Sequence, residues 1–253
     1  MSSYLVTGVA RGLGLEIVRI LSSQPANEVS KVFATIRSSP PPALQEIVDK
    51  SDGRLIILNL EVTNLDSIAA AVDEVKKHVG NQGLDILINN AAINKDFPDG
   101  ILTMDNLREM FEVNVEAVHN LTKAFVPLLR EGRRKTVLNM SSITSSFAHA
   151  KRFMIAPHYS YRISKAALNS MTKLYALSLE NEGFTFVAVS PGWAKTDQGG
   201  PYADLEASES AQGTLDVLKK DREALNGKFL NILVPGWENA TGLHKYDGLE
   251  LEW

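Results

Sequence analysis

The sequence predicts a doubly wound α/β fold, in which helices cover both faces of a parallel sheet. Short apolar runs alternate with amphipathic segments along the whole chain, as they do in successive β-α-β units. The apolar runs are also continuous rather than alternating, as is typical of strands buried on both faces. Seven strands are expected, at residues 4–7, 32–36, 55–60, 84–88, 136–140, 184–189 and 229–234.

Six helices are expected between these strands, at residues 12–23, 42–51, 65–79, 104–130, 160–182 and 207–220. Polar side chains at the helix starts can cap free backbone amides, and glycines at the ends can take the left-handed closing conformation. The expected starting residues are Asn64, Thr103 and Ser208, and the expected closing glycines are Gly80, Gly132 and Gly183.

Composition and charge narrow the classes of function. The 253 residues contain no linker that follows a complete domain, so residues 1–253 are expected to form one domain. A net charge of −4 without a basic stripe argues against a nucleic-acid partner. The absence of cysteine and the five scattered histidines argue against a metal site. Because no apolar run approaches the ~20 residues of a membrane span, we expect a soluble, cytoplasmic protein.

The first strand runs into a glycine-rich turn, Thr7-Gly8-Val9-Ala10-Arg11-Gly12-Leu13-Gly14, that opens a helix. Gly8 permits the tight bend, Gly12 lets the backbone approach a pyrophosphate, and Gly14 lets the helix pack close to the sheet. The amide dipoles at the helix start favour an anion. The turn therefore indicates a dinucleotide phosphate site, the alternative being a tight strand-to-helix turn that binds nothing.

Two cations indicate which dinucleotide binds. The second strand ends Thr35-Ile36-Arg37, without the acidic residue that accepts an adenosine ribose hydroxyl in NAD enzymes. Arg11 lies within the glycine turn. Two guanidinium groups suit a 2′-phosphate, so NADP(H) is favoured over NAD, although Arg37 could equally be an ordinary solvated loop residue.

Candidate catalytic side chains follow later strands. Tyr161 and Lys165 are one helical turn apart, and a nearby ammonium stabilises a phenolate and lowers the pKa of a tyrosine. Ser142 follows the 136–140 strand, where a serine can hold a substrate carbonyl, while we expect Ser141 to be structural. Asn114 is a poor helix former within an apolar helix, which indicates either a functional role or a satisfied core amide.

Together these motifs resemble the short-chain dehydrogenase/reductase family over essentially the whole chain, and within it the carbonyl reductases of the C-factor and sniffer type. The resemblance implies a single Rossmann domain that binds NADP(H) and reduces a small-molecule carbonyl. It rests on the glycine turn, Asn89-Asn90-Ala91, Asn114, Asn139-Met140-Ser141-Ser142, Tyr161-x-x-x-Lys165 and the segment Pro191-Gly192-Trp193-Ala194-Lys195-Thr196.

The resemblance also implies roles for matching residues. Tyr161 would donate a proton to the carbonyl oxygen, and Ser142 would polarise that oxygen. Lys165 would bind the nicotinamide ribose and lower the pKa of Tyr161, and Asn114 would hold a water that resupplies the proton. The expected cofactor contacts are Gly8, Arg11, Gly12, Leu13, Gly14, Arg37, Glu61, Val62, Asn90, Ala91, Ala92, Tyr161, Lys165, Pro191, Trp193 and Thr196.

Three departures from the family pattern stand out. Ala92 replaces the usual glycine after Asn-Asn-Ala, and Glu61 replaces the usual aspartate at the adenine contact. The separation of 19 residues between Ser142 and Tyr161 is longer than usual, and we interpret the extra segment as a lip over the substrate site. His149 and His158 in that segment could touch a substrate, but we expect surface histidines.

Substrate residues are expected from Ser142, Thr144, Phe147, Tyr161 and Trp193, with residues 193–210 acting as a lid. The aromatic rings suggest a flat or aromatic ketone. Two other classes stay open: a regulator that binds NADPH without turnover, and an NAD-dependent alcohol dehydrogenase, against which Arg11 and Arg37 argue. The resemblance further implies a homodimer or tetramer formed through the helices that begin near Thr103 and Ser160.

Overall fold

A computed structural model describes residues 1–253 and contains one parallel seven-stranded sheet of order β3-β2-β1-β4-β5-β6-β7. The order reverses between β1 and β4, which defines the doubly wound topology and confirms the predicted fold class. The strands are β1 Ser2–Val6, β2 Val29–Ile36, β3 Leu55–Asn59, β4 Ile86–Asn89, β5 Thr136–Met140, β6 Thr185–Ser190 and β7 Lys228–Asn231.

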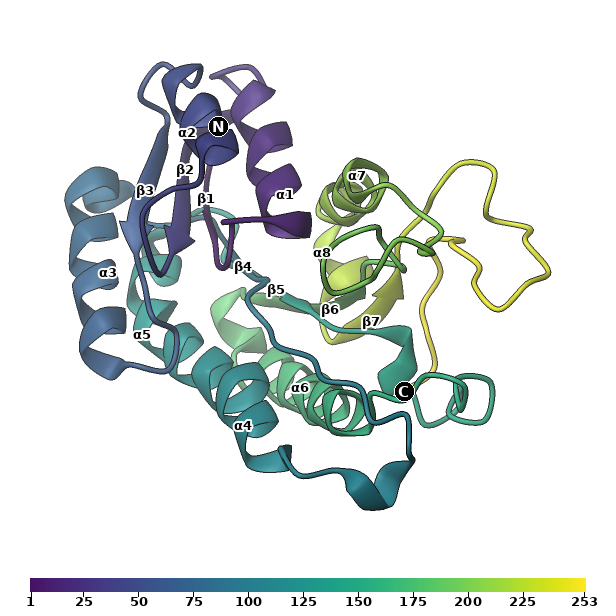
Figure 1. Cartoon of the computed structure of the whole chain (residues 1–253). Helices are drawn as coiled ribbons and strands as arrows, with labels where there is room; N and C mark the ends of the chain where they lie inside the picture. Colours follow the sequence, from purple (N-terminus) through teal and green to yellow (C-terminus); the bar gives the residue numbers. More distant parts are fainter.

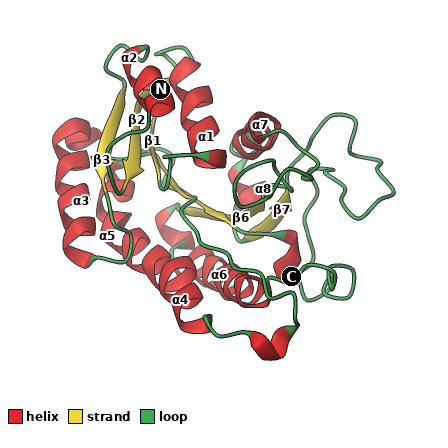
Figure 2. Cartoon of the chain, viewed as in Figure 1, coloured by secondary structure: helices red, strands yellow, loops and turns green.

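Helices cover both faces of this sheet (Figures 1 and 2). One apolar core joins the sheet to α1, α2 and α7, and a second joins the opposite face to α3, α5 and α6. The helices are α1 Gly12–Ser23, α2 Pro42–Asp49, α3 Leu65–Val79, α4 Leu107–Phe111, α5 Ala117–Glu131, α6 Tyr159–Ser178, α7 Ala207–Val217 and α8 Arg222–Leu225. None of them is both long and apolar enough to cross a membrane.

The helix predicted over 104–130 is interrupted. A π-helical turn at Glu112–Glu116 separates α4 from α5, and its buried residue is Asn114. Such turns accommodate an extra residue inside a helix and are frequent at functional sites. The Asn114 amide bonds to the backbone of Ile93, 21 residues earlier in the chain. Apolar periodicity carries no information on such a contact, so it predicted one continuous helix.

Helix ends follow the predictions in part. Asn64 caps α3 by accepting a hydrogen bond from Ser67 N, and Gly183 is left-handed as expected. Gly80 has a positive φ of 53° but a ψ of −135°, so it ends α3 outside the predicted left-handed conformation. Ser208 is not a cap, because α7 begins at Ala207 and Glu206, two residues before Ser208, forms a capping box with Glu209. Thr103 likewise lies in a short 3-10 turn ahead of α4.

Gly132 closes α5 in an extended rather than a left-handed conformation, with φ −69°. Space is the reason for a glycine here, since a Cβ would lie 2.0 Å from the carbonyl oxygen of Leu84. The predicted role of Gly132 as a left-handed closing residue was therefore wrong.

The C-terminal segment pairs with the last strand. β7 ends at Asn231, earlier than predicted, and the chain then returns antiparallel to it through bridges Leu230–Glu250 and Leu233–Asp247. The Trp253 ring stacks on Phe229 with centroids 5.5 Å apart. In Figure 1 the C-terminus consequently lies beside the loop that precedes α6. Helix α8, just before β7, was not predicted because its four residues are too few to show a period.

Candidate active site

The glycine turn between β1 and α1 packs tightly against the end of β4. Gly8 has φ +70°, and a Cβ there would lie 2.9 Å from the Ala91 Cα. A Cβ on Gly14 would lie 2.4 Å from the carbonyl oxygen of Gly8. Gly12, the first residue of α1, faces the methyl group of Thr196. Glycine is thus required at this turn, and the free amides at the start of α1 are suited to a pyrophosphate.

Hydrogen bonds fix the turn to the loop after β4. Thr7 Oγ1 accepts from Asn90 N at 3.0 Å and from Ala91 N at 2.9 Å. Asn90 Nδ2 donates to the carbonyl oxygens of Thr7 at 2.8 Å and Gly8 at 3.1 Å. The Asn90 side chain therefore holds the turn in shape. Its predicted contact with a ribose would have to use the remaining amide oxygen or the backbone.

The two arginines predicted to bind a 2′-phosphate are exposed and lie in different ion pairs. Arg37 Nη1 is 3.7 Å from Glu61, and Arg11 Nη1 is 2.9 Å from Asp197. Their side chains are 74% and 78% exposed, so solvent weakens both pairs. A phosphate dianion would compete for either guanidinium at little cost. Val62, next to Glu61, lines a small cavity together with Ala91.

Tyr161 and Lys165 share one face of α6. Lys165 Nζ lies 5.5 Å from the centroid of the Tyr161 ring and donates to the Met140 carbonyl oxygen at 2.7 Å. Burial raises the pKa of Tyr161 to about 12, opposed by hydrogen bonding with Gln198, and lowers the pKa of Lys165 to about 7. The expected lowering of the Tyr161 pKa by Lys165 is therefore not found, because desolvation dominates at both groups.

Ser142 follows β5 and faces Thr144, with the two hydroxyl oxygens 2.9 Å apart. The backbone beneath it is fixed by a chain of buried hydrogen bonds. Ser141 Oγ donates to Asn169 Oδ1 at 2.5 Å, Asn169 Nδ2 donates to Ser145 Oγ, and Ser145 Oγ donates to the Ser142 carbonyl oxygen. Ser141 is thus structural, as predicted, and Ser142 is the hydroxyl presented by this loop.

Asn114 is completely buried and connects three segments. Its Oδ1 accepts from Ile93 N at 3.0 Å, and its Nδ2 donates to the Ile93 carbonyl oxygen and to Ser164 Oγ, both at 3.0 Å. These bonds fix the loop after β4 against α6, directly beside Lys165. Both amide hydrogens are used in this way, so a water held by this residue would have to bind the second lone pair of Oδ1 or the backbone.

In the lengthened loop before α6, one of the two histidines does not have the surface position expected for it. His158 is not a free surface residue: its side chain is 20% exposed and its ring packs edge-on against Tyr161, with centroids 5.5 Å apart. Phe153 in the same loop is fully buried, whereas Phe147 is exposed. The loop is therefore packed against the site. The sequence could not predict this packing, because the loop is irregular and its apolar residues follow no period.

Several buried polar residues support the site and were not predicted. Asn89 Nδ2 donates to Asn139 Oδ1 at 2.8 Å, and Asn139 Nδ2 donates to Thr172 Oγ1 at 2.9 Å. Asn169, described above, lies four residues after Lys165 on the same face of α6. Continuing the four-residue spacing from Tyr161 through Lys165 would have identified it.

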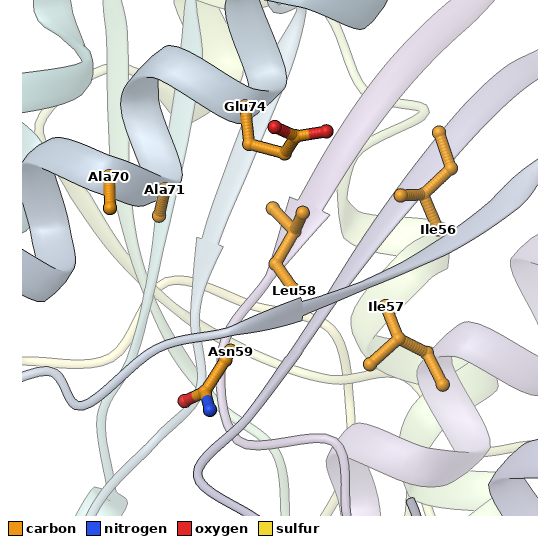
Figure 3. Close-up of a pocket in the computed structure, with 7 residues that line it drawn as sticks. All are labelled: Ile56, Ile57, Leu58, Asn59, Ala70, Ala71 and Glu74. Atoms are coloured by element: carbon orange, nitrogen blue, oxygen red, sulfur yellow. The ribbon is translucent and has the colours of Figure 1, made fainter.

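A separate hollow lies along the outer edge of the sheet, between β3 and α3. It is lined mainly by apolar side chains, together with Asn59 and Glu74 (Figure 3). None of the predicted site residues lines it. The candidate active site is instead the region bounded by the glycine turn, Ser142 and Tyr161 at the carboxyl ends of the strands, where doubly wound sheets bind their ligands.

The fold and this site define an α/β protein with a dinucleotide-type glycine turn and, on α6, a half-buried tyrosine one helical turn before a buried lysine. A family model described as short chain dehydrogenase matches residues 3–206. The chain belongs to the short-chain dehydrogenase family, which confirms the resemblance seen in the sequence.

Individual relatives agree with this assignment. The short-chain dehydrogenase/reductase atnB of Arthrinium sp is 30% identical over 239 residues, covering 90% of this chain and 86% of its own. The carbonyl reductase Sniffer of D. melanogaster superposes with a TM-score of 0.86 at 31% identity and covers 100% of both chains. An NADPH-bound carbonyl reductase from chicken fatty liver has the same TM-score at 32% identity, covering 100% of this chain and 99% of its own.

Proposed function

We propose that this protein is an NADPH-dependent carbonyl reductase whose general acid is Tyr161. The observation that carries the proposal is the Tyr161–Lys165 pair, in which Lys165 donates to the Met140 carbonyl oxygen at the end of β5, two residues before Ser142. Similarity to two carbonyl reductases over the full chain supports it. The relatives do not favour the alternative of a regulator without turnover.

The site residues divide the chemistry among them. NADPH, when bound, would supply a hydride to the carbonyl carbon. Tyr161 is protonated at neutral pH, as an ordinary tyrosine is, and it donates that proton to the carbonyl oxygen. Burial raises its pKa further, to about 12. Ser142 Oγ donates a hydrogen bond to the same oxygen and polarises it. Lys165 and Asn114 hold Tyr161 and its surroundings in place, so Asn114 acts as a positioning residue.

The cofactor site has the shape that a dinucleotide needs. Gly12 and Gly14 leave room where any side chain would fill the turn, and the amides of Gly12 and Leu13 open α1. Arg11 and Arg37 would bind the 2′-phosphate, Glu61 and Val62 the adenine, and Asn90, Ala91 and Ala92 the neighbouring ribose. Pro191, Trp193 and Thr196 would contact the nicotinamide. A Cβ on Gly12 would lie 3.3 Å from the Thr196 methyl group, so Thr196 faces the glycine turn, which supports this placement.

The preference of the enzyme for NADPH or NADH tests the proposed function. Following absorbance at 340 nm with a panel of ketones, aldehydes and quinones, we expect NADPH to be oxidised in preference to NADH. Replacing Arg37→Ala should lower kcat/KM for NADPH about 10- to 100-fold, since a charged hydrogen bond is lost, and leave NADH unaffected. Arg130→Ala, which removes an exposed arginine paired with Glu182, is the matched control. A strong preference for NADH would instead favour the oxidative alcohol dehydrogenase.

A flat or aromatic ketone is the proposed substrate. Ser142 and Thr144 supply hydroxyls at one side of the site, and Phe147 and Trp193 supply exposed aromatic surface. Residues 193–210 would form the lid over this site. Within this segment, Ala194 and Leu205 form a parallel β-bridge that joins its two halves. Turnover confined to short aliphatic carbonyls would contradict this substrate class.

We also propose a cytoplasmic homodimer or tetramer. Helices α4 and α6 lie side by side and expose large apolar side chains to solvent, namely Leu107, Phe111, Ile163, Leu174 and Leu177. Such a surface is typical of an interface between copies. Light scattering on the purified protein is expected to give two or four times the mass of one chain, and a mass of one chain would refute the assembly.

A further inference from the structure

A hydrogen-bonded cluster joins the lid to the C-terminal segment. Asp204 in the lid accepts a hydrogen bond from the Tyr246 hydroxyl at 2.6 Å, and His244 Nδ1 lies 2.7 Å from the same carboxylate oxygen. The carboxylate only accepts, so the histidine must carry its proton on Nδ1. We refer to Asp204, His244 and Tyr246 as the clasp.

The clasp also holds Trp193, the first residue of the lid. Trp193 N donates to the Tyr246 hydroxyl at 3.2 Å, and Trp193 Nε1 donates to the Gly199 carbonyl oxygen at 2.7 Å. The indole packs against the His244 ring, with centroids 5.3 Å apart. The backbone amide and the indole nitrogen of Trp193 are thus both hydrogen-bonded, while 38% of Trp193 remains exposed.

The lengthened loop before α6 reaches the same cluster. The Phe153 ring stacks on His244 with centroids 5.6 Å apart and an interplanar angle of 21°. Arg152 Nη2 donates to the Gly242 carbonyl oxygen at 2.9 Å. The lid, the C-terminal segment and the loop before α6 are far apart in sequence, and all three therefore meet at His244.

Asp204 and His244 in the clasp are largely removed from solvent. The side chains of Asp204 and His244 are only 19% and 13% exposed. A carboxylate removed from water to this degree is costly unless donors satisfy it, and the two donors come from the C-terminal segment. Removing either donor therefore loosens the lid as well as the segment that carries the donor.

We propose that Asp204, His244 and Tyr246 are positioning residues that fix Trp193 as a wall of the substrate site and so set the preference for flat carbonyl compounds. The inference rests on the proposed reductase function. A flat substrate gains binding energy from an indole already held in place, because no side-chain entropy is lost on binding. A small aliphatic carbonyl compound is too short to contact Trp193, so it gains no binding energy from the indole.

Tyr246→Phe is the variant of choice, since it keeps the ring packed against Trp237 and removes only the hydroxyl that joins Asp204 to Trp193. With an aromatic ketone we expect KM to rise about tenfold and kcat to stay within about twofold, from the loss of a hydrogen bond to a charged group. The kcat/KM for a short aldehyde should not change. Tyr175→Phe, which removes a hydroxyl bonded to His119 instead, is the matched control.

Hydrogen exchange supplies a readout that needs no turnover. In Tyr246→Phe the amides of residues 193–206 are expected to exchange about tenfold faster, while those of α3 keep their wild-type rates. Asp204→Asn provides a second route to the same effects should Tyr246→Phe fold poorly. A KM that rises equally for both substrates, or unchanged exchange in the lid, would overturn the clasp. If the wild type reduces no carbonyl, the exchange experiment still decides whether the clasp holds Trp193.

Discussion

Tyr161→Phe is expected to lower the rate of carbonyl reduction about 10³-fold, which is the usual contribution of a positioned general acid. The variant keeps the ring that packs against His158 and below Lys165, so the local structure should persist. Only the acidic proton is lost. Single-turnover oxidation of NADPH with a saturating aromatic ketone measures the effect on the chemical step.

NADPH binding provides the control for this variant. The dissociation constant, followed by the fluorescence of the bound nicotinamide, is expected to change less than about threefold, because the proposed phosphate contacts are on the glycine turn and not on Tyr161. Retention of more than about a tenth of the wild-type rate would identify a different proton donor. His158 would then be the first residue to test, since it is the titratable side chain packed against the tyrosine ring.

Lys165→Met is expected to abolish measurable activity while making the protein more stable at neutral and acidic pH. Burial lowers the pKa of Lys165 to about 7, against about 10.4 in the unfolded chain. Below pH 7 both states hold the proton, and the folded protein carries the full cost of a buried ammonium. The variant removes that cost but leaves the Met140 carbonyl oxygen without its donor.

The pH dependence of the free energy of unfolding distinguishes the cost of a buried charge from a change in packing. Between pH 7 and about 10.5 the unfolded state binds more protons than the folded state, so wild-type stability rises with pH over this range. We therefore expect a gain for Lys165→Met of about 2–3 kcal/mol, or roughly 5 °C, at pH 6 that shrinks steadily and is gone above about pH 10.5. Thermal unfolding of both proteins across this range measures it. A gain independent of pH would show that better packing, not charge, is responsible.

The fold and the reactive side chains were predictable because they depend on local patterns. Continuous apolar runs correspond to strands that the structure buries on both faces, and the spacing of Tyr161 and Lys165 places them on one face of α6 whatever surrounds them. The glycine turn was predictable for the same reason, since Gly8 requires a backbone conformation that other residues rarely adopt.

The supporting contacts were not predictable because they join distant segments. Nothing near His244 in the sequence indicates that Asp204 and Phe153 will meet it. Asn114 was noticed as an anomaly, but its partner Ile93 is 21 residues away, and the resulting π-helical turn leaves no periodic signal. The reversal of the expected pKa at Tyr161 has the same origin, since burial depends on the packed structure rather than on neighbours in the helix.

The return of the C-terminal segment along β7 limits how sheets of two copies can meet. Asn231 N donates to the Leu249 carbonyl oxygen at 2.9 Å, and Leu251 N donates to the Phe229 carbonyl oxygen at 2.7 Å, so the outer side of β7 is already hydrogen-bonded within the chain. A second copy therefore cannot add its own strand there without displacing residues 247–251. Another strand could pair with this sheet only at β3, at the opposite end, and any other assembly of this protein must be built on helices or loops.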